Sequence, residues 1–291
     1  MGFLFDYQIN YYSDSKHETL VPFSVFALTQ QGLDHQTMNI GNQDSGSLYV
    51  GKKTITGALA DGCTSGENLN GKSANQVGAH IGSYLAVRIT RKLLFKKHIP
   101  LNEGFLPAFE QELILNYKKL LNALSPWQFE KDSVIRNLFL TTIIFFVITE
   151  DEYFIASCGD GDVIINNVHK DLNIHSGKYF ASNLRDTQRL EDGKYSIKPN
   201  LGFNLIEHGR TTDLNNLLIA TDGFLDNDIK ENSVFHKFFF NGIDQNSSSG
   251  FKDRRTEFRR DFLTPVLQMK GSRIWPHDDA TFISLKRIAK T

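Results

Sequence analysis

The chain has 291 residues, a net charge of −1 at pH 7 and a hydrophobic fraction of 40%, which is enough for a sizeable core. The balanced charge supplies no field that would draw it to nucleic acid or an anionic membrane, and no apolar run reaches the ~20 residues of a membrane-spanning helix. With no N-terminal signal segment and only two cysteines, Cys63 and Cys158, we expect a reduced, cytoplasmic protein.

The first part of the chain predicts short strands. Val21–Thr29 is apolar and reads as one strand, and Leu48–Val50 and Thr56–Ala60 read as two more that pair in a hairpin. This arrangement would place Asp44 and Asp61 on loops beside neighbouring strands, within reach of a common ion.

Two helices are expected next. The first begins at Ser73, because Ser73 and Gln76 fit a capping box and apolar residues then recur at helical spacing. The second covers Asn102–Ala123, with Phe105 and Phe109 on its inward face.

The middle of the chain is rich in predicted strands. Leu138–Thr149 and Tyr153–Cys158 indicate an antiparallel hairpin, and Val163–Asn166 is expected to continue the same sheet. Residues 170–213 are polar, with several glycines and a proline, and predict a loop-rich flap over the site.

The last part of the chain predicts strands and helices again. Leu217–Ala220 and Ala280–Leu285 read as strands, and Ser233–Phe240 and Phe251–Met269 as helices. We see no internal repeat and no linker, so residues 1–291 are expected to form one domain. Helices segregated from antiparallel strands favour the α+β class.

Three acidic positions follow or precede apolar runs. Asp61-Gly62 and Asp222-Gly223 end such runs, and Asp278-Asp279 opens another. Carboxylates that converge repel one another, so one must bind a proton or a cation must neutralise them. Mg²⁺, Mn²⁺ and Ca²⁺ prefer oxygen ligands of this kind. The pattern therefore predicts a divalent metal site built from strand ends.

Asp-Gly pairs also have a simpler interpretation as turns. Asp192-Gly193 lies in a polar stretch with no strand before it and is interpreted as a turn. Asp160-Gly161 follows a predicted strand, so Asp160 stays a candidate for an additional metal ligand.

The ordered motifs resemble the metal-dependent protein phosphatases of the 2C type, in a form most similar to the bacterial branch. The resemblance extends over roughly residues 24–285, and its pieces are Asn42-Gln43-Asp44, Ala60-Asp61-Gly62, Cys158-Gly159-Asp160, Thr221-Asp222-Gly223 and Asp278-Asp279-Ala280-Thr281.

This resemblance implies an α-β-β-α sandwich of two antiparallel sheets flanked by helices, with two or three divalent cations, Mn²⁺ or Mg²⁺, between the sheets. It assigns Asp61 to both main cations, Asp222 and Asp278 to the first, and the Gly62 carbonyl to the second. By the same resemblance Asp44 would hold a metal-bound water.

The resemblance also assigns places around the ligands. Asp160 matches the ligand of a third, weaker metal, and Asp279 stands beside the ligands where the family often has asparagine. Gln43 replaces a frequent glutamate ligand, and Cys63 replaces the histidine often proposed as general acid. The phosphate-binding arginine has no clear counterpart, and His35 is the candidate to contact substrate phosphate instead.

The function implied is hydrolysis of phosphoserine and phosphothreonine in a partner protein by a metal-bridging hydroxide. A cognate serine/threonine kinase would phosphorylate that protein. Two alternatives use the same aspartates. One is a hydrolase of small phosphate esters, and the other is a non-catalytic 2C-like module that binds a phosphoprotein or a regulator. Neither a nucleic acid nor a membrane partner is expected.

Overall fold

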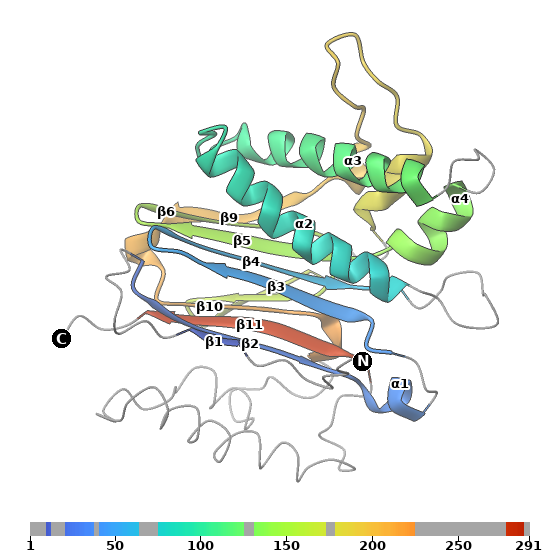
Figure 1. Cartoon of the computed structure of the whole chain (residues 1–291). Helices are drawn as coiled ribbons and strands as arrows, with labels where there is room; N and C mark the ends of the chain where they lie inside the picture. The colour runs from blue at the N-terminus through green and yellow to red at the C-terminus, as the bar shows by residue number, and fades with distance from the viewer. Residues whose placement is uncertain are drawn as a thin grey trace.

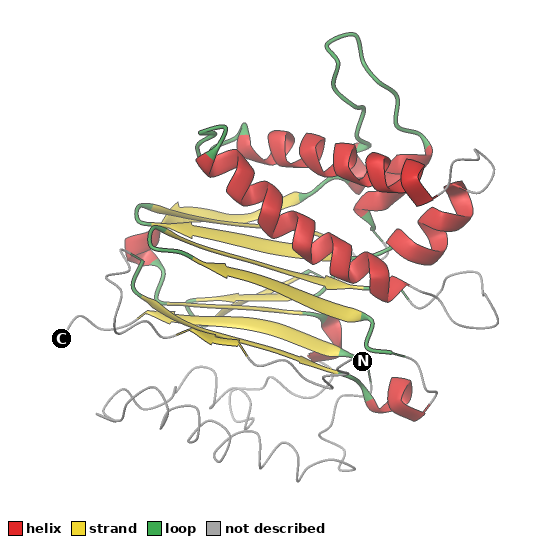
Figure 2. Ribbon diagram, viewed as in Figure 1, coloured by secondary structure: helices red, strands yellow, loops and turns green. Residues whose placement is uncertain are grey.

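Two antiparallel sheets lie face to face, and helices cover the outer face of one of them (Figure 1). The computed structural model describes residues 10–12, 21–37, 41–63, 75–124, 131–172, 178–224 and 278–287. Figure 2 shows the long helices gathered on one side of the strands, and this segregation confirms the predicted α+β class.

The sheet beneath the helices has five strands in the order β3-β4-β5-β6-β9. Their bounds are Asp44–Val50 for β3, Thr54–Asp61 for β4, Ile143–Thr149 for β5, Glu152–Cys158 for β6 and Asn204–Arg210 for β9. The predicted hairpins β3–β4 and β5–β6 are both present.

The second sheet has six strands in the order β1-β2-β11-β10-β7-β8. Their bounds are Asn10–Tyr12 for β1, Phe23–Gln30 for β2, Ala280–Arg287 for β11, Asn216–Ala220 for β10, Asp162–Ile165 for β7 and Val168–Asp171 for β8. The last described strand, β11, pairs with both β2 and β10 and therefore lies inside the sheet.

Two long helices cover the five-stranded sheet, α2 (Asn75–Phe95) and α3 (Phe105–Leu124). The shorter helical elements are α1 (Leu33–Thr37), α4 (Lys131–Val134), the π-helix η2 (Ile135–Phe139) and the 3₁₀ turns η4 (Phe180–Arg185), η5 (Pro199–Leu201), η6 (Thr211–Asp213) and η7 (Asp222–Phe224). None of the helices in the described ranges combines the length and apolar character needed to span a bilayer.

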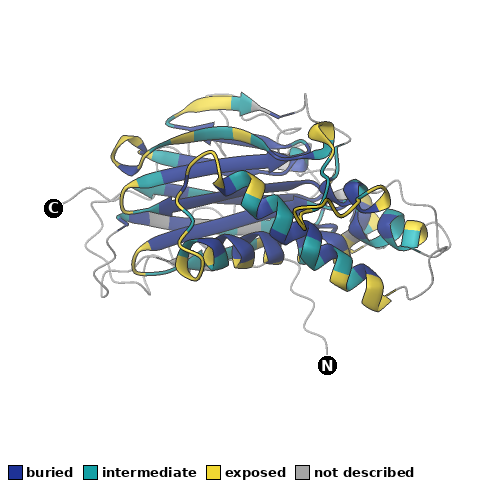
Figure 3. Cartoon of the chain, turned by 90° about the horizontal axis from the view of Figure 1, so that it is seen from above, coloured by how far each residue is buried: buried dark blue, intermediate teal, exposed yellow. Residues whose placement is uncertain are grey.

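Strand β5 is apolar along most of its length because both of its faces are buried. Phe145 and Val147 belong to the core beneath the helices, whereas Ile144 and Phe146 belong to the core between the sheets. A strand buried on both faces has no polar alternation. The dark central strands in Figure 3 show this burial.

The structure corrects two sequence predictions in this region. The apolar run from Leu138 is not all strand, because Leu138 and Phe139 end the π-helix η2 and β5 begins at Ile143. β7 does not continue the sheet of β6 but belongs to the other one. The chain changes sheets through Gly159 and Gly161, whose φ angles of 102° and 119° favour glycine.

Part of the predicted flap is anchored to the sheet. The buried Cys158 sulfur lies 3.8 Å from the Lys178 carbonyl oxygen and 3.6 Å from the Leu201 carbonyl oxygen, so its single S–H lies between the two ends of residues 178–201. Burial raises the pKa of this thiol to about 12, which suits a structural rather than a reactive cysteine. That residues 170–213 form a flap over the site stays a prediction.

Several predicted features lie outside the described residues: the capping residue Ser73 and the helices Ser233–Phe240 and Phe251–Met269.

Candidate metal centre

Asp44 and Asp61 are direct partners in the register of β3 and β4. Both are strand residues, which corrects the prediction that they lie on loops. The Gly62 N–H donates to the Gln43 carbonyl at 3.1 Å, and the Thr142 N–H donates to the Asp61 carbonyl at 2.9 Å. Residues directly opposite in an antiparallel pair share one face of the sheet. The register therefore brings the two carboxyl groups together.

The second sheet supplies Asp222 and Asp278. Ala220 of β10 pairs with Phe282 of β11, so the residues after β10 and before β11 leave the sheet at the same end. Gly223 lets these segments approach closely, because a Cβ on Gly223 would lie 2.0 Å from the Asp279 carbonyl oxygen. Asp222 and Asp278 are thus neighbours at this end.

Thr221 links the two sheets at the same place. Its hydroxyl donates to the Asp44 carboxylate at 2.6 Å and accepts the Thr281 N–H at 2.9 Å. The side chain of Thr221 is buried, so the bond to Asp44 fixes a carboxylate of one sheet against the backbone of the other. Thr221 was not among the predicted site residues. Its position between an apolar run and Asp-Gly was the available signal.

The aspartates interact strongly with one another. Burial, followed by repulsion from Asp44 and Asp222, raises the pKa of Asp61 well above its ordinary value, and Asp278 adds to the effect. Burial also raises the pKa of Asp44 to about 8, with further repulsion from Asp279 and Asp222, although the bond from Thr221 opposes the shift. The four predicted carboxylates are therefore close enough to interact at one edge of the sandwich, although Asp44, Asp61 and Asp222 do not belong to the group of described residues whose ligand atoms all lie within 4.8 Å of one another.

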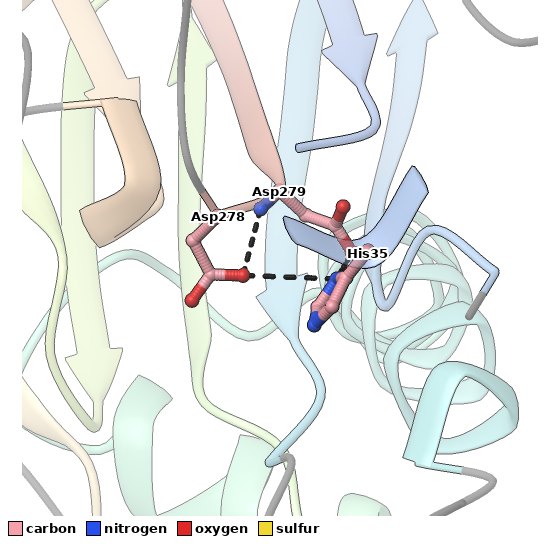
Figure 4. A group of neighbouring side chains, drawn as sticks. All are labelled: His35, Asp278 and Asp279. Carbon is pink, nitrogen blue, oxygen red and sulfur yellow. Dashed lines mark hydrogen bonds and ion pairs between the residues drawn. The ribbon is translucent and has the colours of Figure 1, made fainter. Parts of the chain in front are cut away.

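His35 and Asp279 form a buried pair at this edge (Figure 4). His35 Nδ1 lies 2.8 Å from Asp279 Oδ2 and 3.7 Å from Asp278 Oδ1. The hydrogen bond to Asp279 is the main reason that the pKa of His35 is raised. The three residues offer ligand atoms within 4.8 Å of one another. His35 thus contacts acidic side chains of the site.

Cys63 and Asp160 lie at the edge of the site with Tyr179, which comes from the predicted flap. Tyr179 is half-buried, and its hydroxyl shares a hydrogen bond with Cys63. Burial, this bond and the charges of Asp160 and Asp61 raise the pKa of Tyr179. Tyr179 was not among the predicted site residues, and nothing in its local sequence distinguishes it from a core tyrosine.

The donor set fits a hard divalent cation. Asp44, Asp61, Asp222 and Asp278 offer carboxylate oxygens, which are the ligands that Mg²⁺ and Mn²⁺ prefer. Within the described ranges, no lysine or arginine forms an ion pair with Asp44 or Asp61. A cation would offset the burial and the mutual repulsion that raise the pKa values of both carboxyl groups.

The raised pKa of Asp44 predicts a pH dependence of the metal-free protein. A folded-state pKa of about 8 lies above the ordinary value of about 3.9. The stabilising contribution is therefore complete near pH 4 and is lost as the pH rises towards 8, with a slope of at most about 1.4 kcal/mol per pH unit. Urea unfolding in chelator at pH 5, 6, 7 and 8 should show this decline. Asp44→Asn should flatten it, and an equal slope in both proteins would contradict the assignment.

A protein-family model identifies the family of the chain. The model described as protein phosphatase 2C matches residues 31–258, which include Asp44, Asp61, Asp160 and Asp222. The chain belongs to the protein phosphatase 2C family. The match ends before Asp278, so the last ligand candidate is placed beside the others by the fold alone. No curated protein matches the chain in sequence.

Solved structures agree with the 2C fold. A serine-threonine phosphatase 2C from Toxoplasma gondii has a TM-score of 0.52 and 13% identity, with 97% of this chain and 99% of that chain covered. A bacterial serine phosphatase has a TM-score of 0.50 and 14% identity, covering 92% and 98%. The serine/threonine phosphatase Stp1 from Staphylococcus aureus has a TM-score of 0.49 and 15% identity, covering 96% and 99%.

Membership of the 2C family is consistent with a metal site built from these aspartates. The family consists of metal-dependent phosphatases that act on phosphoproteins, so a phosphoryl-hydrolase fold and an acidic metal site are expected together. The individual roles of Asp44, Asp61, Gly62, Asp160, Asp222 and Asp278 stay predictions.

Proposed function

We propose that this protein is a metal-dependent serine/threonine protein phosphatase. The observation that supports it best is the convergence of Asp44 and Asp61 from one sheet with Asp222 and Asp278 from the other, in a chain of the 2C family. A non-catalytic fold has no physical need for such mutual repulsion, because replacing buried charges by neutral groups is often stabilising.

Each proposed ligand is assigned to a particular cation. Asp61 would contact two cations, Asp222 and Asp278 the first of them, and the Gly62 carbonyl the second, with Asp160 beside a third and weaker site. Divalent cations, when bound there, supply hydroxide near neutral pH and offset charge on the phosphoryl oxygens. Mn²⁺ and Mg²⁺ are the candidates.

The chain's own residues would orient the reaction. Asp44 is held by the Thr221 hydroxyl at 2.6 Å, so its carboxylate can accept a hydrogen bond from attacking water in a constant direction. Cys63 would be a weak proton donor to the leaving alkoxide, which could take its proton from solvent water instead.

The proposed substrate is phosphoserine or phosphothreonine in a protein, phosphorylated by a cognate serine/threonine kinase in the cytoplasm. Disulfides are rare in cytosolic proteins, and this chain has only two cysteines, Cys63 and Cys158. The part of residues 170–213 near the site, including Tyr179, is where we place selectivity between proteins and small molecules.

A substrate panel tests this function. The full chain is assayed with Mn²⁺, Mg²⁺ or chelator on phosphoserine and phosphothreonine peptides, sugar phosphates and nucleotides, with phosphate release as the readout. We expect metal-dependent release with kcat/KM at least about tenfold higher on the peptides, a difference of about 1.4 kcal/mol. Faster release from sugar phosphates or nucleotides would replace this proposal with a small-molecule hydrolase.

Gln43 favours one alternative, a module that binds phosphoproteins without hydrolysing them. Its neutral amide is a weaker ligand than the glutamate of related sites, and Gln43 is buried beside Asp44. Binding of a phosphopeptide measured by calorimetry, with no phosphate release under any metal, would support that alternative and reject the enzyme.

A further inference from the structure

We propose that the Asp279 carboxylate and the His35 imidazole form a positioning pair that sets the distance between Asp44 and Asp278. The inference rests on the proposed function, in which these two aspartates face the metals. It adds a role for two residues that contact no substrate in the proposal. It also assigns His35 to the protein framework instead of to substrate phosphate.

Two backbone N–H groups and the His35 ring converge on the Asp279 carboxylate. Gly32 N donates to Oδ1 at 2.7 Å and Gln43 N donates to Oδ2, while His35 Nδ1 lies 2.8 Å from Oδ2 at ion-pair distance. Asp279 is 2% exposed and His35 is 5% exposed, so these bonds are shielded from water. A carboxylate only accepts hydrogen bonds, so the contact is attractive in the form of His35 that carries a proton on Nδ1.

The bonds connect both sheets at the site. Asp279 lies directly before β11 and next to Asp278, whereas Gln43 lies directly before β3 and next to Asp44. The bond from Gln43 N therefore ties the segment that carries one proposed ligand to the segment that carries the other. His35 also faces Asp278, at 3.7 Å, and limits where that exposed carboxylate can turn.

In this chain both oxygens of Asp279 accept a backbone N–H, which the asparagine frequent at this position in the family could not do. An asparagine would have one acceptor oxygen and one NH₂ group. With NH₂ in the place of Oδ1 it would face the Gly32 N–H, and in the place of Oδ2 it would face the Gln43 N–H. Either orientation leaves a buried backbone donor without its acceptor, so Asp279→Asn should release one of the two segments.

Mn²⁺ binding to the full chain, measured by calorimetry, tests the pair without relying on turnover. We expect Asp279→Asn to weaken Mn²⁺ binding about 10–100-fold, which is the usual effect of losing a group that orients a ligand. His35→Leu should also weaken it. His35→Asn should recover most of the affinity, because its amide can donate near the place of Nδ1. Unfolding in urea reports whether each variant folds.

Glu112→Gln is the matched control. Glu112 is a buried carboxylate on α3 that accepts Lys92 Nζ at 2.7 Å and Lys97 Nζ at 2.5 Å, outside the proposed site. This variant should lose stability and keep its Mn²⁺ affinity.

The outcomes distinguish a failure of the positioning role of Asp279 and His35 from a failure of the proposed phosphatase function. If the wild-type chain binds Mn²⁺ and a folded Asp279→Asn variant binds it equally well, the positioning role is wrong and the proposed function stands. If Asp279→Asn does not fold, equal affinities of His35→Leu and His35→Asn would overturn the role. A wild-type chain that binds no Mn²⁺ would overturn both proposals.

Discussion

Replacing Asp61 by asparagine is expected to abolish metal-dependent phosphate-ester hydrolysis and, without metal, to stabilise the fold. Asp61 is the residue proposed to contact two cations, so its loss should lower kcat/KM by about 1,000-fold or more, which is about 4 kcal/mol in the barrier. In chelator at pH 8 the same change removes the repulsion with Asp44 and Asp222 and should raise the free energy of unfolding by about 1 kcal/mol or more.

The order of stability should therefore invert when metal is added. The wild-type protein should gain about 2.7 kcal/mol at a Mn²⁺ concentration 100 times its Kd, whereas Asp61→Asn should gain much less. Thermal unfolding with and without Mn²⁺, together with aryl phosphate turnover, gives both readouts. Glu103→Gln, in the exposed turn before α3, is the matched control and should behave as wild type in every condition. A full Mn²⁺ shift or normal turnover in Asp61→Asn would reject the metal centre.

The Gly223→Ala substitution is expected to cost both stability and metal affinity. The added Cβ would lie 2.0 Å from the Asp279 carbonyl oxygen and 2.9 Å from its carbon, and backbone atoms cannot move aside as a side-chain tip can. The turn that carries Asp222 must then separate from the segment that carries Asp278. We expect a loss of roughly 2–4 kcal/mol in the free energy of unfolding and a Mn²⁺ Kd raised at least about tenfold.

Gly57→Ala separates these two effects. Its Cβ would also clash, at 2.4 Å from the Phe146 ring, but in the core between the sheets and four residues before Asp61. It should lose about 1–3 kcal/mol of stability and bind Mn²⁺ as the wild type does. Urea unfolding and calorimetry measure both quantities. Equal Mn²⁺ affinities in the two glycine variants would show that the contact at Gly223 does not position the ligands.

Most strands and both long helices could be predicted because burial leaves a local pattern. β5 is apolar throughout since both of its faces are buried, and Glu150–Glu152 interrupts the run where the chain turns into β6. α3 was predicted within a few residues because its inward side chains, such as Phe105 and Phe109, recur at helical spacing.

Strands without that pattern could not be predicted. β9, Asn204–Arg210, alternates between half-buried and exposed residues and forms an edge strand because β6 offers backbone partners along its side. The change of sheet between β6 and β7 depends on which strands are left to pair, a property that neither strand carries in its own residues.

Some residues of the candidate site could likewise be predicted from the sequence and others could not. Asp61 and Asp222 stood out because each follows an apolar run and precedes glycine. Thr221 and Tyr179 did not, because their importance lies in the partners Asp44 and Cys63, which come from distant parts of the chain. His35 was predicted to contact phosphate, whereas its contact with Asp279 could not be predicted, because the two residues are more than 240 positions apart in the chain.

The sequence by itself determined the types of the main elements, the acidic ends of several strands and the resemblance to 2C phosphatases, since each is recorded in neighbouring residues. Only the tertiary structure decided that Asp44 pairs with Asp61 in register and that Asp279 binds donors from two segments. Strand register and buried hydrogen bonds depend on contacts between residues far apart in the chain. A local sequence pattern does not indicate which distant residue a given residue will pair with.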